Sequence, residues 1–387
     1  MPTLFPDPTL FRSLVPYRPS ARAAMARLAD VDFGNPSSVH LEGRAARSLL
    51  ERAREAIARA IGASPVEIVL TGSATEANNL AIKGAAWARA TKGRPGVVVS
   101  AIEHPSVLAP AQWLAGLGDG ASLGIVGVDA SGLITPAALE AALTEGVGVV
   151  SVIAANNETG ALAPVAALAE VAHDHGAWLH VDAAQALGRV PVDVEAWGAD
   201  LVTLSSHKLG GPRGAGALWI RTGLELVPIS HGGHQERNRR GGTEDVVAVV
   251  GFGAVCDEAT DGLAHETERL ATLRDRLWAG IEPLGGVRRL GEPTRCLPNT
   301  LSVAFEGAEG ETLLMALDLA GVSVSSGSAC TAGSLEPSHV LLAMGLDDAT
   351  ARSVVRFSLG WSTTVEEIDG AIARLPDLVR RAREVAA

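Results

Sequence analysis

The chain has little of what marks secreted, membrane-spanning or nucleic-acid-binding proteins. Its 387 residues include only three cysteines, Cys256, Cys296 and Cys330, too few for a disulfide framework, so a reducing cytoplasm is expected. Basic residues are not in excess, and the net charge of −12 disfavours non-specific binding to nucleic acid or to anionic membranes. The apolar stretch at residues 147–155 is too short to span a bilayer. The opening residues, MPTLFPDPTLF, lack a basic region and an unbroken apolar core, so no signal peptide is expected.

What is present suits a turn-rich α/β enzyme. The apolar fraction is 47%, with 43 glycines and 20 prolines, and the length allows one large domain and a smaller one. From about residue 43 to 257, apolar runs alternate with segments of helical spacing, such as residues 44–61. Unbroken apolar runs fit strands that are covered on both faces, as in a parallel sheet. The strands are predicted at residues 67–70, 96–100, 147–154, 177–181, 201–204 and 215–220.

The pattern changes after residue 255. A long charged helix is predicted at about residues 261–281, and strands at 300–305 and 354–359. Thr364 and Glu367 resemble a capping box that opens a last helix. We therefore expect an α/β protein with two domains. The large domain, with a mainly parallel sheet, would comprise residues 17–257, and the smaller α+β domain residues 258–387 together with 1–16.

Lys208 is the most informative residue. It follows the apolar run at residues 201–204 and stands directly after Ser205, Ser206 and His207. An amine at the end of a buried strand is unfavourable unless it is used. Lysines that can lose their proton serve as Schiff-base nucleophiles. Taken alone, Lys208 is better interpreted as a surface lysine just past a strand end, and only the rest of the chain favours a chemical role.

Polar residues follow nearly every predicted strand, at the edge where open α/β sheets bind ligands. After residues 67–70, a turn of small residues leads into a helix, where backbone N–H groups and the Thr75 hydroxyl can hold a phosphate or simply cap the helix. His104 can stack on a ring or cap a loop. Asn157 can orient a ring hydroxyl, although such turns are also common for conformational reasons. Asp182, inside an apolar strand, needs a cation, either a protonated ring nitrogen or a structural ion pair.

Eight segments follow one another along the chain: TGSATEANNLAIKGAA, EHPSV, NNETG, HVDAAQ, SSHKLGGP, RRGGTEDV, SSGSACTAGSLEPSHVL and VRFSLG. Together these motifs resemble the ordered signature set of the class V aminotransferase-like enzymes that depend on pyridoxal 5'-phosphate (PLP). More narrowly, they resemble cysteine desulfurases of the NifS/IscS type. The resemblance runs from about residue 33 to 375 and implies the aspartate aminotransferase-like fold of PLP-dependent transferases.

The resemblance implies a role for each residue of a cofactor site. Lys208 would hold PLP as a Schiff base, Asp182 would pair with the pyridine nitrogen, and His104 would stack on the ring. The residues that would contact the phenolate side and the phosphate are Asn157, Gln185, Thr75, Ser205, His207 and, from the partner subunit of a homodimer, Thr243.

It also implies a substrate site and a sulfur carrier. Arg356, helped by Asn35, would bind the carboxylate of L-cysteine. Cys330 lies among small residues, which suits a mobile thiol that takes up sulfur as a persulfide, whereas a structural cysteine prefers apolar neighbours. Its long loop resembles that of desulfurases that pass sulfur to an acceptor protein such as an iron–sulfur scaffold. Cys256 and Cys296 are expected in packing or surface roles, and no metal site is expected.

One segment departs from the family. Residues 9–16 lack the aspartate and the Ala-Thr-Thr run with which the family opens, which leaves substrate choice and turnover open. Three alternatives stay open: a selenocysteine lyase, an enzyme with another class V activity such as transamination, and a weakly active homologue that acts as a partner subunit. The identity of the sulfur acceptor is open as well.

Overall fold

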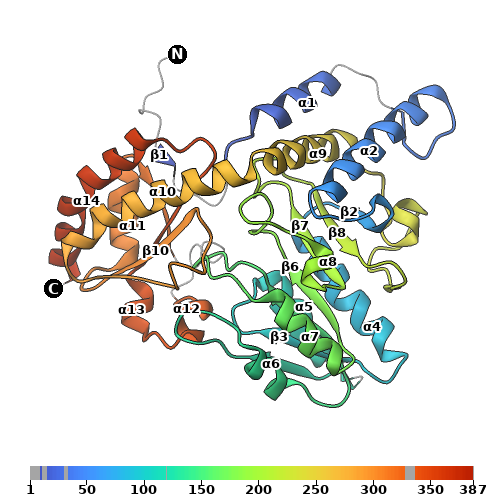
Figure 1. The fold of residues 1–387 in the computed structure, drawn as a ribbon, viewed down its shortest axis with the longest axis horizontal. Coiled ribbons are helices and arrows are strands. Elements are labelled where there is room, and N and C mark those ends of the chain that lie inside the picture. Colours follow the sequence, from blue (N-terminus) through green and yellow to red (C-terminus); the bar gives the residue numbers. More distant parts are fainter. Residues whose placement is uncertain (1–8, 11–14, 30–33, 119, 327–335, 387) are drawn as a thin grey trace.

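A large sheet and a smaller C-terminal sheet, each with its own hydrophobic core, form the architecture (Figure 1). The structure, a computed structural model, describes residues 9–10, 15–29, 34–118, 120–326 and 336–386. The long helix α10 (Leu263–Ile281) runs from the large part towards the C-terminal one. In the described part of the chain, no helix is both long enough and apolar enough to cross a membrane.

The large sheet has seven strands in the order β2-β8-β7-β6-β5-β3-β4. Every strand is parallel to its neighbours except β8, which is antiparallel to both β2 and β7. The predicted runs form strands to within a residue or two. Strand β4 was not predicted, because its short segment at the edge of the sheet is only partly buried. The bounds are β2 (Ile68–Thr71), β3 (Gly96–Ser100), β4 (Leu123–Val126), β5 (Val147–Ile153), β6 (Trp178–Asp182), β7 (Leu201–Ser205) and β8 (Gly216–Ile220).

Helices cover both faces of this sheet, which explains why its central strands are apolar throughout. Helix α2 (Leu41–Arg59) turns Ala46, Leu50, Ala53 and Ile57 inward, because residues three or four apart share one helix face. With α1 (Pro19–Ala29), α7 (Val165–Asp174) and α9 (Val246–Asp261), it covers one face. The other face carries α3 (Ala74–Asn79), the π-helix η2 (Leu80–Gly84), α4 (Ala85–Ala90) and α5 (Pro105–Gly116).

The C-terminal sheet is antiparallel, in the order β12-β13-β10-β9. Its strands are β9 (Val287–Arg289), β10 (Thr300–Phe305), β12 (Ser325–Ser326) and β13 (Val354–Ser358). Helices α10, α11 (Gly310–Leu319) and α14 (Val365–Ala386) bury their apolar faces against it. The predicted capping box is present, since Thr364 Oγ1 accepts from Glu367 N and Glu367 Oε2 accepts from Thr364 N.

The N-terminal segment joins this C-terminal part. Strand β1 (Thr9–Leu10) pairs in parallel with β11 (Val322–Ser323). The rest of the atypical segment, residues 11–14, lies outside the described residues. The remaining elements are η1 (Pro65–Glu67), α6 (Pro136–Ala142), α8 (Val194–Trp197), η3 (Gln235–Asn238), η4 (Glu282–Leu284), α12 (His339–Ala343) and α13 (Asp348–Arg352).

Candidate active site

A cavity of about 280 Å³ lies where the carboxyl ends of several strands of the large sheet meet the C-terminal sheet. Parallel strands end at one edge, so residues far apart in the sequence come together there. Nine of the residues predicted for the site line this cavity: Thr75, His104, Asn157, Asp182, Gln185, Ser205, His207, Lys208 and Arg356.

Asp182 ends β6 and is only 3% exposed. Its Oδ1 accepts from Ala184 N (2.9 Å) and its Oδ2 from Asn78 Nδ2 (2.8 Å). It forms no ion pair with any residue that the structure describes, so the structural ion pair considered above is not found there. A buried carboxylate of this kind suits a cationic ligand.

His104 is held as a neutral imidazole at the N-cap of α5. Its Nδ1 accepts from Ser106 N (3.1 Å), and Ser106 Oγ lies 2.7 Å away. Burial lowers the pKa of His104 below its usual value. The negative charge of Asp182 raises this pKa, whereas the positive charges of Lys208 and His339 lower it further. A neutral ring at this place can lie flat against an aromatic ligand.

Three other lining residues, Thr75, Ser205 and His207, are suited to a phosphate. Ser205 Oγ lies 3.1 Å from His207 Nδ1, and burial together with nearby cations lowers the pKa of His207 to about 4. Thr75 lies in the first turn of α3, where free backbone N–H groups favour an anion. The turn before it passes so close to β8 that a Cβ on Gly216 would come within 2.5 Å of the Ser73 backbone, and only glycine fits there.

Arg356 reaches the cavity from the C-terminal sheet. It is 1% exposed on β13, opposite Ser302 and Ser325, and its Nη1 donates to the Asn157 carbonyl oxygen (2.6 Å). The buried Glu158 follows in the same turn, and its Oε2 accepts from Ser338 Oγ (2.5 Å). Burial raises the pKa of Glu158 to about 7, although Ser338 and Arg356 favour the ionised form.

Two of the predicted site residues that the structure describes do not line this cavity. Asn35 is exposed, and its Oδ1 accepts from Ser37 N in its own loop (2.9 Å). Thr243 is exposed as well. Cys330 lies outside the described residues.

The two described cysteines have structural surroundings. Cys256 is buried in α9, and burial raises the pKa of its thiol. Cys296 Sγ accepts from Arg274 Nη1 (3.2 Å) and donates to the Pro293 carbonyl oxygen (3.3 Å). Within the described residues, no group of three or more His, Cys, Asp or Glu side chains is placed to bind a metal.

Sequence reasoning missed two residues in contact with the site. Asn78 binds Asp182 and Ser106, and its buried Oδ1 has no hydrogen-bond partner among the described residues. The sequence could have indicated Asn78, because it stands three residues after Thr75 and therefore shares a helix face with it. Arg189 binds Gln185 and the Lys208 backbone, and no sequence pattern indicates these contacts.

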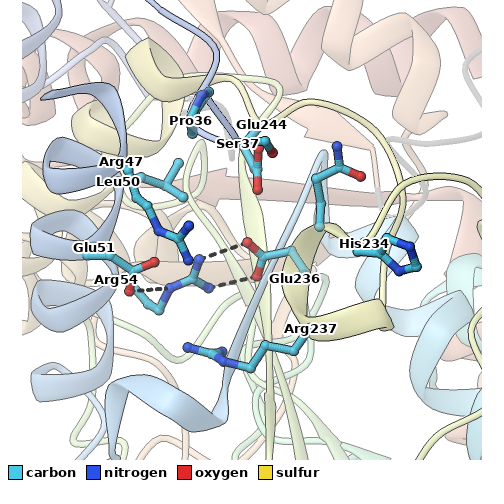
Figure 2. Close-up of a pocket in the computed structure, with 11 residues that line it drawn as sticks. Pro36, Ser37, Arg47, Leu50, Glu51, Arg54, His234, Glu236, Arg237 and Glu244 are labelled. Atoms are coloured by element: carbon cyan, nitrogen blue, oxygen red, sulfur yellow. Dashed lines mark hydrogen bonds and ion pairs between the residues drawn. The ribbon is translucent and has the colours of Figure 1, made fainter. Parts of the chain in front are cut away.

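A second, polar cavity of about 170 Å³ lies between α2 and the loop that leads to Thr243 (Figure 2). Arg54 points between Glu51 and Glu236 there, and it donates to both carboxylate oxygens of Glu236 at 2.7 Å. Glu236 also accepts a hydrogen bond from Leu70 N. It is the first of three consecutive non-glycine residues with left-handed φ angles, which are 44°, 57° and 66°. The buried ion pair therefore holds this strained turn against the sheet, close to the exposed Thr243.

Comparisons with known proteins agree with this geometry. The sequence pattern of the family "Aminotransferase class-V" matches residues 22–370. The "Cysteine desulfurase IscS" of Dictyoglomus turgidum is 40% identical over 376 residues, covering 97% of this chain and 95% of that protein. The "IscS-like cysteine desulfurase" of Mycobacterium tuberculosis is 43% identical over 378 residues, covering 96% and 95%. A solved "NIFS-LIKE PROTEIN" superposes with a TM-score of 0.87 at 32% identity, covering 97% of this chain and 98% of that one.

The chain therefore belongs to the aminotransferase class-V family, whose members depend on PLP. Within that family it belongs with the cysteine desulfurases of the NifS/IscS type.

The residues in the cavity fit PLP. Asp182 supplies a buried negative charge with no cationic partner among the described residues, which suits a protonated pyridine nitrogen. Lys208 presents an amine to the same cavity, and the neutral His207, Ser205 and the start of α3 suit the phosphate. Asn78 and Gln185 add further polar groups.

Proposed function

We propose that this chain is a PLP-dependent cysteine desulfurase that converts L-cysteine to L-alanine and transfers the sulfur to Cys330 as a persulfide. The observation that carries the proposal is one cavity lined by an amine, a buried carboxylate and a buried guanidinium, those of Lys208, Asp182 and Arg356. Membership among the NifS/IscS-type cysteine desulfurases supports the same reaction.

Each of these groups has a distinct task in the proposal. When bound, PLP supplies an electron sink that stabilises negative charge at the substrate α-carbon. Asp182 would keep a proton on the pyridine nitrogen, and His104 would lie against the ring. Lys208 would anchor the cofactor and move the proton at the α-carbon of the substrate. Arg356 would bind the substrate carboxylate with its planar fork, helped by Asn35.

The sulfur transfer needs no further reactant. The Cys330 thiolate attacks the sulfur of L-cysteine, a new S–S bond forms, and the substrate C–S bond breaks. The electron pair of that bond stays on carbon, where a proton completes L-alanine. One L-cysteine and the Cys330 thiol thus become one L-alanine and one persulfide, which carries the sulfur to an acceptor.

The proposal extends to assembly, acceptor and location. Thr243 is exposed beside a turn held by the Arg54–Glu236 ion pair and does not line the cavity of its own chain. This supports a homodimer in which Thr243 completes the phosphate site of the partner subunit. We further propose an iron–sulfur scaffold as sulfur acceptor and a cytoplasmic location. The proposed domains are residues 17–257 and residues 258–387 together with 1–16.

One assay tests the reaction. Purified protein with PLP should release alanine and sulfide from L-cysteine in the presence of a thiol reductant, and Cys330→Ser should release neither above background. Amino-group transfer to a 2-oxo acid, or a strong preference for L-selenocysteine, would favour the alternative activities. PLP binding without any turnover would favour a weakly active partner subunit.

A further inference from the structure

Arg189 is a buried charge whose role the proposed reaction leaves unexplained. It is 6% exposed and forms no ion pair with any residue in the described ranges. Its neighbour Arg18, in contrast, pairs with Glu258 at 2.8 Å. Burial, and then the charge of Arg18, lower the pKa of Arg189 to about 10, which leaves it protonated at neutral pH. A buried cation of this kind depends on hydrogen bonds for its stability.

Those hydrogen bonds join two walls of the cavity. Nη1 of Arg189 donates to the backbone oxygen (2.8 Å) and to the side-chain Oε1 (2.9 Å) of Gln185, in the turn after β6. Nη2 donates to the backbone oxygen of Lys208 (2.7 Å), in the turn after β7. Thr267 of α10 in turn donates to the Arg189 carbonyl (2.9 Å). One guanidinium therefore sets the position of Gln185 relative to Lys208.

The contact with Oε1 decides which end of the Gln185 amide meets a ligand. A glutamine amide has one accepting oxygen and one donating NH2 group. Because Arg189 occupies the oxygen, the NH2 group is left to face the cavity that Gln185 lines. Without Arg189, the amide could turn over and present its oxygen, which repels an anionic oxygen on a ligand.

Arg189 also brings a positive charge to the turn that carries Lys208, because its Nη2 donates to the Lys208 backbone oxygen. Like charges disfavour protonation of one another, so a nearby guanidinium makes a lysine nitrogen easier to deprotonate. Arg189 already contributes, after burial and two other cations, to the lowered pKa of His207, the residue next to Lys208.

We propose that Arg189 is a positioning residue of the cofactor site, which holds the Gln185 amide with its NH2 group towards the phenolate oxygen of PLP and fixes the backbone that carries Lys208. This inference rests on the proposed function, because it takes PLP as the ligand.

The test uses the visible absorption band of the holoenzyme and the affinity of the apoenzyme for PLP, neither of which depends on turnover. Arg189→Met removes both the donor to Gln185 and the cation near Lys208. The pH midpoint at which the visible band changes should therefore rise by about one unit. The affinity for PLP should fall roughly ten- to hundredfold, as expected for lost hydrogen bonds to a charged group. Arg189→Lys restores the positive charge but not the planar guanidinium fork. It should therefore reverse most of the change in the pH midpoint but only part of the loss in affinity for PLP.

Arg18→Met is the matched control. Arg18 Nε donates to the carbonyl of Leu209, the next one along the same turn, but Arg18 does not contact Gln185. This variant should leave the pH midpoint within about 0.2 units of that of the native protein. At about 1.4 kcal/mol per pH unit, this is a change of roughly 0.3 kcal/mol.

Three outcomes would contradict the inference. The positioning role would be excluded if Arg189→Met kept both the proton dissociation constant of the visible band and the affinity for PLP within about twofold of the native values. Equal effects in Arg18→Met would show general anchoring of the turn. If Arg189→Met does not fold, a native midpoint and affinity in Arg189→Lys would overturn the role of the fork. A native protein with no visible band at all would instead overturn the cofactor assignment in the proposed function.

Discussion

Glu158 should make the stability of this protein fall as the pH rises through neutrality. The side chain is 3% exposed, in the turn that also binds Arg356. Burial raises its pKa from 4.5 to about 7, against the opposing effects of the Ser338 hydroxyl and the Arg356 charge. Glu158→Gln keeps the size and a carbonyl oxygen for Ser338 but cannot ionise, so it isolates the effect of the charge.

The sign and size follow from the two pKa values. Between pH 4.5 and 7 the folded chain holds the Glu158 proton more tightly than the unfolded chain does. The protonated side chain therefore makes its full contribution to the free energy of unfolding below the lower pKa. This contribution is lost progressively as the pH rises to the upper pKa. Between pH 5 and 8.5 the native protein should lose on the order of 2–3 kcal/mol of unfolding free energy through this group alone. Glu158→Gln should not show this loss.

Urea unfolding of both proteins at pH 5 and 8.5, with saturating PLP, measures the effect as a difference of differences. All other titrating groups are common to the two proteins and cancel. Glu140→Gln, on the exposed face of α6, is the control for the charge change itself and should shift stability by less than about 0.5 kcal/mol. Parallel pH profiles for Glu158→Gln and the native protein would refute the reasoning. So would a variant that is less stable at pH 8.5, because Glu158 would then be ionised and favourably paired with Arg356.

The remaining predictions concern the reacting groups. Lys208→Ala should lose the visible band and the borohydride-reducible link to PLP; the only other lysines, Lys83 and Lys92, do not line the cavity, and a reducible adduct on either would refute the anchor. Cys330→Ser should bind PLP normally yet form no persulfide, and mass spectrometry that finds the sulfur mainly on Cys256 or Cys296 would contradict its role. Arg356→Ala should reduce kcat/KM by about 2–4 kcal/mol, or roughly 30- to 1,000-fold, without rescue by Arg356→Lys, and near-native kinetics would exclude it as the carboxylate site.

The fold was largely readable because the central strands are buried on both faces and therefore apolar throughout. The direction of β8 was not part of the prediction, although only ten residues separate it from β7, too few for a parallel crossover. Strand β4 escaped notice because an edge strand is half exposed and carries a weaker apolar signal.

Lys208, Asp182 and His104 could be singled out from the sequence because each stands at the end of an apolar run, and the geometry of a parallel sheet brings such ends together. The sequence by itself thus determined six of the seven strands of the large sheet, the edge at which the site lies and the chemical groups found there. Only the tertiary structure decided which groups touch. Arg189 acts mainly on backbone oxygens, and Glu158 meets Ser338 across 180 residues. Contacts to backbone atoms and across such distances leave no periodic trace in a sequence, because packing of the two sheets, rather than local spacing, creates them.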